Sequence, residues 1–112
     1  MVYDGDEGRL SEASFLNDFA GDVPRDRARI LYAVQQPFRR ALVAEKTTIA
    51  AWRSKPSYYA VSTEDRTIDP AFERFMAKRM KAHTIELRSS HLSPVSHSRE
   101  ISDLISLAAS RA

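Results

Sequence analysis

The spacing of apolar residues in the first half of the chain is the spacing of amphipathic helices. Apolar positions recur three and four residues apart, and this period predicts helices over residues 11–20, 24–36 and 38–44. No alternating pattern appears before residue 52, so we expect no strand there. Residues 1–10 are polar and contain two glycines, which is typical of a loop or a free terminus.

Residues with strong positional preferences mark the ends of the first two helices. Ser11 suits the N-cap of the first helix, and Gly21 suits its C-cap. Pro24 fits the first turn of the second helix. Pro37 ends that helix, because the residue before a proline avoids the α region.

The second half begins with a short run of aromatic and β-branched residues. Residues 56–62 have the composition of a buried strand, and the run stops at an acidic turn over residues 63–66. A second strand is predicted over residues 84–87, and it leads directly into Ser89-Ser90-His91. These two strands are the only ones that the pattern predicts.

Two amphipathic helices alternate with the strands. The first begins at Asp69-Pro70, an acid at the N-cap followed by a proline at the first helical position. The second is capped by Ser98. The apolar stripes that we expect to lie on the sheet are Phe72, Phe75, Met76 and Met80 in the first helix, and Ile101, Leu104, Ile105 and Ala108 in the second.

The order strand–helix–strand–helix predicts an α/β fold with two parallel strands and a right-handed crossover. The carboxyl ends of both strands then meet at one edge of the sheet, where α/β proteins place their functional sites. We therefore expect Asp65 and His91 at that edge. Two parallel strands are few for a buried sheet. The half-chain is either the end of a larger doubly wound domain or a small domain that closes its sheet by dimerising.

The amino-acid composition excludes several classes of function. The 112 residues suffice for one domain, and the net charge of +2 comes from basic residues dispersed among acids, which argues against a nucleic-acid surface. The absence of cysteine excludes disulfides and a thiol nucleophile. The three histidines lack metal-ligand spacing, so we expect neither metal nor cofactor. With no signal peptide and no membrane span in the pattern, we expect a soluble cytoplasmic protein without membrane or nucleic-acid partners.

A series of ordered segments carries a family resemblance. The segments are Phe15-Leu16-Asn17-Asp18-Phe19-Ala20, Asp22-Val23-Pro24, Gln36-Pro37, Trp52-Arg53-Ser54-Lys55-Pro56-Ser57, Thr63–Ile68, Arg74–Met80 and Ser89–Ser98. Together they resemble the C-terminal portion of an α/β-hydrolase, in particular small bacterial members related to plant esterases and hydroxynitrile lyases. The resemblance implies an incomplete α/β-hydrolase fold. Residues 1–52 would be a helical cap, and residues 53–112 the last two parallel β–α units of the core.

The resemblance also implies two site residues. Asp65 stands at the acid and His91 at the base of a Ser–His–Asp triad, in the chain order that this fold requires. Glu64 remains open as a competitor for the acid. Asp69 is better explained as an N-cap, His97 as a structural residue at the start of the last helix, and His83 as the start of a strand.

The nucleophile of the family is missing from this sequence. It sits in a Gly-Xaa-Ser-Xaa-Gly elbow, and none of Gly5, Gly8 and Gly21 flanks a serine in that spacing. We therefore expect no hydrolysis by this chain alone. It would act on a small ester or acyl substrate only when completed by the missing half. The alternatives are a truncated remnant that self-associates through its exposed sheet edge, and an independent small binding domain.

Overall fold

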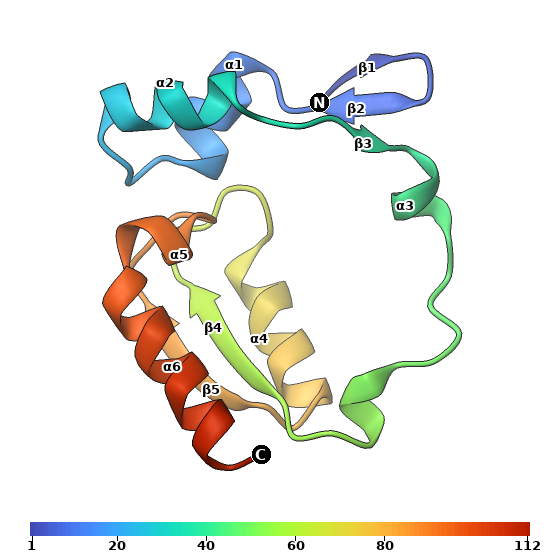
Figure 1. Cartoon of the computed structure of the whole chain (residues 1–112), viewed down its shortest axis with the longest axis vertical. Helices are drawn as coiled ribbons and strands as arrows, with labels where there is room; N and C mark the ends of the chain where they lie inside the picture. The colour runs from blue at the N-terminus through green and yellow to red at the C-terminus, as the bar shows by residue number, and fades with distance from the viewer.

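The chain folds into two parts joined by an extended connection (Figure 1). The computed structural model describes residues 1–112. The N-terminal part, residues 1–44, contains β1 (Val2–Asp4), β2 (Glu7–Arg9), α1 (Glu12–Ser14), the π-helix η1 (Phe15–Phe19), α2 (Arg25–Ala33), β3 (Phe38–Arg39) and α3 (Ala41–Ala44). The connection includes the short 3-10 helix η2 (Ala51–Arg53). The C-terminal part, residues 58–112, contains β4 (Tyr58–Ser62), α4 (Pro70–Arg79), β5 (His83–Leu87), α5 (Ser93–Ser96) and α6 (Ser98–Ser110).

Three short antiparallel strands in the N-terminal part contradict the prediction of helices alone. They pair in the order β1-β2-β3, and β3 occupies the start of the helix predicted over 38–44. Gly5 has a φ of 56° and allows the tight turn between β1 and β2. Gly8 leaves room for the rings of Tyr3 and Phe38 on either side of it, and a Cβ there would lie 2.8 Å from Tyr3 Cε1. Strands of two or three residues are too short to show an alternation of apolar and polar residues, so the sequence pattern did not predict them.

The helices of the N-terminal part follow the predicted order with shifted ends. Ser11 is the N-cap of α1, as predicted, and its hydroxyl accepts a hydrogen bond from the Ser14 N–H at 3.3 Å. Ala20, not Gly21, caps the π-helical continuation. The second helix begins one residue after Pro24 and ends at Ala33, before the predicted boundary at Pro37.

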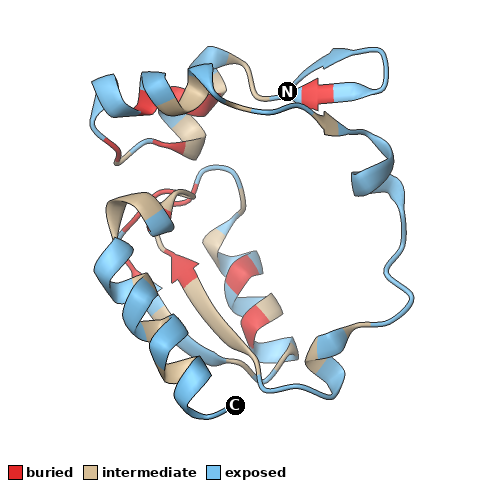
Figure 2. Ribbon diagram, viewed as in Figure 1, coloured by how far each residue is buried: buried red, intermediate tan, exposed pale blue.

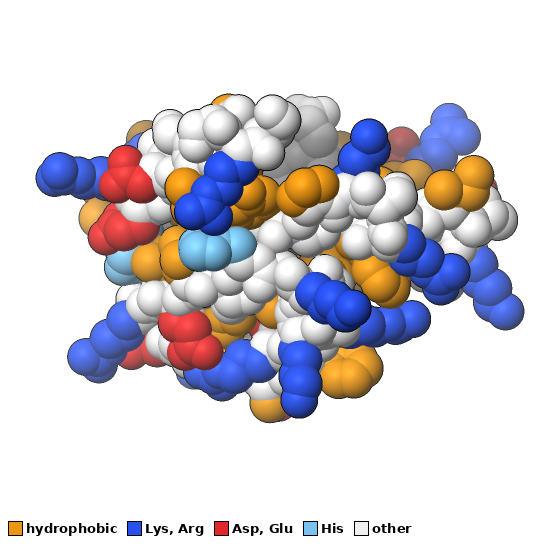
Figure 3. All heavy atoms as spheres, turned by 90° about the horizontal axis from the view of Figure 1, so that it is seen from below, with side chains coloured by type: hydrophobic (Ala, Val, Ile, Leu, Met, Phe, Trp, Pro, Cys, Tyr) orange, Lys and Arg blue, Asp and Glu red, His pale blue; other side chains and the backbone are white.

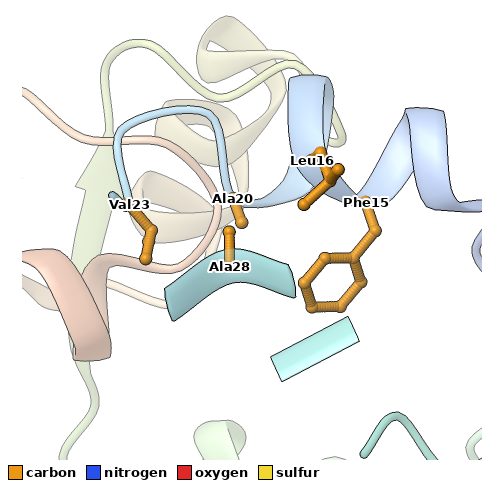
Figure 4. Packing of buried hydrophobic residues seen from close by; sticks show 5 residues of the cluster. All are labelled: Phe15, Leu16, Ala20, Val23 and Ala28. Atoms are coloured by element: carbon orange, nitrogen blue, oxygen red, sulfur yellow. The ribbon is translucent and has the colours of Figure 1, made fainter. Parts of the chain in front are cut away.

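The buried apolar cluster of the chain lies between η1 and α2. Its members are Phe15, Leu16, Ala20, Val23 and Ala28 (Figure 4). Leu92 and Val95 of the C-terminal part pack against this cluster. The contact therefore joins the N-terminal part to the loop and short helix that follow β5.

The parallel strand pair was predicted correctly. β4 and β5 are aligned from Tyr58 opposite His83 to Ser62 opposite Leu87. Asp69 is the N-cap of α4 and accepts a hydrogen bond from the Ala71 N–H at 2.7 Å, also as predicted. The N-cap of α6 is His97 rather than Ser98.

The helices α4 and α6 cover opposite faces of this sheet. Successive side chains of a strand point to opposite faces. Glu86 of β5 points to α4, where its carboxylate meets the Arg74 guanidinium at 2.7 Å. The neighbouring Ile85 and Leu87 line a groove with Leu104 of α6. Both faces of the strand pair are therefore covered, as parallel strands require.

The rotation of α4 differs from the predicted stripe. Phe72 and Phe75 are 53% and 55% exposed, and their rings stack on the outer side of the helix with centroids 5.9 Å apart. Glu73 and Ala77 are the buried residues of this helix. The small Ala77 side chain allows a close approach to the strand, which the larger rings would prevent. In α6, Ile105 likewise points outward, whereas Leu104 is half-buried.

Few residues of the chain are removed from solvent. Only 15 of the 112 residues are buried (Figure 2), and apolar side chains reach the surface between Lys and Arg on the face seen in Figure 3. Because apolar burial supplies most of the folding free energy, a core of this size predicts low stability for the chain on its own.

Two phenylalanines provide a matched test of this packing. Phe15→Ala should lower the free energy of unfolding by about 3 kcal/mol, because Phe15 is buried against Phe19 and Tyr32. Phe75→Ala should lower it by less than about 0.5 kcal/mol, because that ring is exposed. Urea unfolding followed by circular dichroism measures both. Equal losses in the two variants would contradict the assigned rotation of α4.

Candidate active site

Asp65 and His91 lie together at the carboxyl ends of the two parallel strands. β4 ends at Ser62 and β5 ends at Leu87, so the turn after one and the loop after the other emerge side by side. Asp65 Oδ2 and His91 Nδ1 are 2.6 Å apart. The side-by-side placement follows from the register, which aligns Ser62 with Leu87.

Backbone N–H groups of the following turn hold the Asp65 carboxylate. Its Oδ1 accepts hydrogen bonds from the N–H groups of Thr67 at 2.6 Å and Ile68 at 2.9 Å, which leaves Oδ2 for His91. Burial alone would raise the pKa of Asp65, but the hydrogen bonds from Ile68, His91 and Thr67 together lower it. The carboxylate is therefore ionised at neutral pH and accepts the Nδ1–H of His91. That tautomer leaves Nε2 free to take a proton.

Glu64 points away from the histidine. Its carboxylate meets the Arg88 guanidinium at 2.6 Å at the protein surface. The sequence left Glu64 and Asp65 both open as the acid, and the structure places only Asp65 against His91.

The N-terminal part contributes an aromatic wall to His91. The Phe19 ring at the end of η1 lies against the imidazole, with ring centroids 4.9 Å apart. The Leu92 N–H donates a hydrogen bond to the Phe19 carbonyl at 3.2 Å, which fixes the loop to the end of η1. Sequence reasoning did not identify Phe19 as a neighbour of the histidine, because 72 positions separate the two residues.

A second polar link joins the two parts next to the site. The Ser90 hydroxyl donates a hydrogen bond to Asp22 Oδ1. His97 Nδ1 lies 3.1 Å from Ser96 Oγ and 3.8 Å from Asp22 Oδ2. Burial opposes ionisation of Asp22, but hydrogen bonding, led by Ser90, holds the pKa of this carboxyl below its usual value. His97 therefore belongs to the link with Asp22 and not to the Asp65–His91 pair.

His83 lies at the opposite end of the sheet from this pair. It is the first residue of β5, its N–H donates to the Ser57 carbonyl at 2.8 Å, and its ring packs 5.7 Å from that of Tyr58. Both contacts hold the start of the strand pair together.

Glu73 of α4 is a further acidic residue at this site. Glu73 of α4 is 4% exposed, and its Oε2 accepts a hydrogen bond from the Ser62 N–H at 3.0 Å. Burial, together with the nearby Asp65, raises the pKa of Glu73 to about 7. The sequence pattern did not single out Glu73, because this residue lies between members of the predicted apolar stripe and a glutamate in such a helix is ordinarily exposed.

An open hollow of about 300 Å³ lies beside these groups along the unpaired side of β4. Tyr58 and Tyr59 line it together with Asp65, Glu73 and His91. Asp65 is the one hydrogen-bond partner of the His91 ring, and no serine or threonine hydroxyl is hydrogen-bonded to that ring. The arrangement offers a charged acid and an oriented base without an adjacent nucleophile.

The rest of the chain shows two further features that bear on chemistry. No group of three or more His, Asp or Glu side chains is placed to hold a metal ion. No helix is both long and apolar enough to cross a membrane.

Comparison with known proteins connects this geometry to a family. The model of the alpha/beta hydrolase family matches residues 3–104. Neither a curated protein nor a solved structure matches the chain.

The raised pKa of Glu73 makes a prediction about stability. Between its ordinary value of 4.5 and about 7, the folded chain keeps a proton on Glu73 that the unfolded chain has lost. Wild-type stability should therefore fall as the pH rises through this window, relative to Glu73→Gln, which cannot ionise. The full difference corresponds to on the order of 3 kcal/mol. Urea unfolding from pH 4.5 to 8 measures it.

The control for this prediction is Glu86→Gln. Glu86 is an exposed carboxylate paired with Arg74 on the same face of the sheet. Its replacement should leave the pH slope between 5 and 7 as in the wild type. A stability difference between Glu73→Gln and the wild type that stays constant from pH 5 to 7 would contradict the assignment of a raised pKa.

Proposed function

Because the chain belongs to the alpha/beta hydrolase family, we propose that it supplies the acid and the base of a Ser–His–Asp site that hydrolyses a small ester or acyl compound. The observation that carries the proposal is the 2.6 Å contact between Asp65 Oδ2 and His91 Nδ1 at the carboxyl ends of adjacent parallel strands. In α/β-hydrolases the acid precedes the histidine along the chain, and Asp65 precedes His91.

The chemistry assigned to the two residues follows from their hydrogen bond. His91 Nε2 takes the proton of a serine hydroxyl as the hydroxyl attacks the acyl carbon, and then returns that proton to the leaving group. Asp65 keeps the proton of the neutral imidazole on Nδ1 and stabilises the imidazolium that forms. The two backbone N–H groups on Asp65 Oδ1 keep the carboxylate oriented for this role.

In this proposal the nucleophile and the oxyanion hole come from further polypeptide. The sequence has no Gly-Xaa-Ser-Xaa-Gly elbow. β4 pairs with β5 on one side only, so its other side is open to a further parallel strand. The hollow that contains His91 lies on this same open side. A strand that paired there would bring its carboxyl-end turn beside His91, and the chain alone would not turn over substrate.

Residues 1–52 are proposed to act as the cap over this site, and residues 53–112 as the end of the hydrolase core. Three contacts support the assignment: the Phe19 ring against His91, the hydrogen bond from Ser90 to Asp22, and the packing of Leu92 on the buried cluster. An aromatic wall from the cap suits an apolar acyl group. The resemblance to esterases and hydroxynitrile lyases is consistent with such a substrate.

A second function is favoured by the exposed apolar surface. The open side of β4 lies next to α4, whose outer side exposes Phe72 and Phe75. An unpaired strand beside exposed aromatic rings is a ready template for strand pairing. On this reading the chain is a non-catalytic module that pairs with a second copy of itself.

Complementation tests the first function. The chain is co-expressed with a fragment of an α/β-hydrolase that carries the nucleophile elbow and the preceding strands, and hydrolysis of a p-nitrophenyl ester is measured. We expect activity with both fragments and none with either alone. His91→Ala should reduce kcat/KM by at least about 10³-fold, and Asp65→Asn by on the order of 10⁴-fold.

The matched control is His97→Ala, which removes a histidine that contacts Asp22 instead of Asp65. It should retain most of the complemented activity. Loss of activity in His97→Ala with retention in His91→Ala would contradict the site assignment.

Light scattering during size-exclusion chromatography tests the second function. Pairing through β4 predicts a dimer whose apparent mass falls to that of the monomer in Phe72→Ser/Phe75→Ser. A wild-type chain that is monomeric at all accessible concentrations would contradict it.

A further inference from the structure

The Glu73 carboxyl contains a buried oxygen without a donor. Glu73 Oε2 accepts the Ser62 N–H, but no donor group reaches Oε1, and Oε1 is buried. A buried polar atom without a partner destabilises the fold. Its presence beside Asp65 therefore calls for an explanation in terms of that site.

The number of hydrogen-bond donors to each carboxyl indicates which of Asp65 and Glu73 is neutral. Asp65 accepts two backbone hydrogen bonds and one from His91, whereas Glu73 accepts one backbone hydrogen bond. Two buried carboxyls next to one imidazole cannot both ionise at low cost. Glu73, with fewer donors, keeps its proton.

A proton on Glu73 resolves the unpartnered oxygen. A protonated Oε1 would become a hydrogen-bond donor, and the Asp65 carboxylate, which lines the same hollow as Glu73, is the acceptor that we assign to it. Burial is the main cause of the raised pKa of Glu73, and hydrogen bonding to Asp65 and the charge of Asp65 add to it. The Ser62 N–H and His91 act in the opposite direction. The unpartnered Oε1 and the raised pKa of Glu73 therefore both indicate a protonated carboxyl.

No other charged or titratable group near Glu73 supplies a hydrogen bond that would stabilise an ionised Glu73 carboxylate. Arg74, the next residue of α4, directs its guanidinium to Glu86 through hydrogen bonds of 2.7 and 2.9 Å. Arg66 of the acidic turn pairs with Asp18 at 3.2 Å. On β4, burial and then the charges of Glu73 and Asp65 raise the pKa of Tyr59, so this phenol remains neutral. His91 makes its hydrogen bond with Asp65 and not with Glu73.

We propose that Glu73 is a positioning residue whose protonated carboxyl donates a hydrogen bond to Asp65 and so holds the Asp65–His91 pair in place. The inference rests on the proposed role of Asp65 and His91, and it adds a regulation of that site by pH. When Glu73 loses its proton, Asp65 loses a donor and gains a like charge beside it. The carboxylate then moves away from Glu73, and the hydrogen bond to His91 is distorted.

Carboxyl NMR on the full chain tests the inference without any activity. In ¹³C-labelled wild type titrated from pH 4 to 9, Glu73 Cδ should titrate near pH 7, and Asp65 Cγ should show an inflection at the same midpoint. Glu73→Gln keeps a donor in the same place and cannot ionise, so the difference in Asp65 Cγ shift between this variant and the wild type should change as the pH rises through the Glu73 midpoint. The control Glu86→Gln should follow the wild type at every pH, because Glu86 lies at the surface with Arg74.

The His91 Nδ1–H proton signal gives a second readout that distinguishes positioning from folding. The difference between the low-field signals of Glu73→Gln and the wild type should be small at pH 5, where Glu73 carries its proton, and larger at pH 9, where that proton is lost. Glu73→Leu has similar bulk without a donor, and its signal should be displaced at every pH. An Asp65 Cγ shift or a His91 Nδ1–H signal whose difference between the wild type and Glu73→Gln does not change with pH would overturn the inference.

Activity separates this inference from the proposed function. In the complemented enzyme, the ratio of Glu73→Gln to wild-type kcat/KM should rise between pH 6 and 8. Absence of any complemented activity would count against the proposed function, while the carboxyl titration would still decide the role of Glu73. A constant ratio in an active complemented enzyme would overturn the inference alone.

Discussion

The parallel pairing of β4 with β5 is the constraint on which the site depends. Its register aligns Ser62 with Leu87, so the acidic turn and the histidine loop leave the sheet at the same level. The Thr63 N–H and hydroxyl both bond to the Leu87 carbonyl, at 2.8 and 3.2 Å, and carry the pairing one residue past β4. The Glu64 N–H then donates to the Ser89 carbonyl at 3.1 Å. The turn and the loop are thus joined by backbone bonds, and a one-residue slip would separate Asp65 from His91.

The N-terminal part depends on the same loop. Its buried cluster is completed by Leu92 and Val95, and its polar link runs from Asp22 to Ser90. Both contacts involve residues within four positions of His91, so the segment that carries His91 also holds the two parts together. The β1–β3 sheet makes no contribution to this junction. This division explains why the wall beside His91 is well packed while residues farther along the N-terminal part remain exposed.

The open side of β4 bears both on the site and on the small number of buried residues in the chain. Glu73 caps the Ser62 N–H on that side, and Asp65 and His91 line the hollow beside it. Phe72 and Phe75 are exposed on the outer side of α4, the helix that carries Glu73. A further strand would cover the hollow, and either proposed function requires something to occupy that side of β4. Covering Glu73 further would strengthen its preference for the neutral form, since burial is the main cause of its raised pKa.

The sequence by itself determined what depends on neighbouring residues. The apolar run before the acidic turn, the Asp69-Pro70 helix start and the Ser11 cap are local signals, and the structure contains each of them. Strand order and chain crossover rules then placed Asp65 and His91 at one edge. Tertiary structure decided what depends on distant residues. These features are the rotation of α4 that buries Glu73, the contact of Phe19 with His91, the bond from Ser90 to Asp22 and the short strands β1 to β3. Side-chain size across the α4 contact and pairing partners far along the chain determine these features, and neither is encoded in a local period.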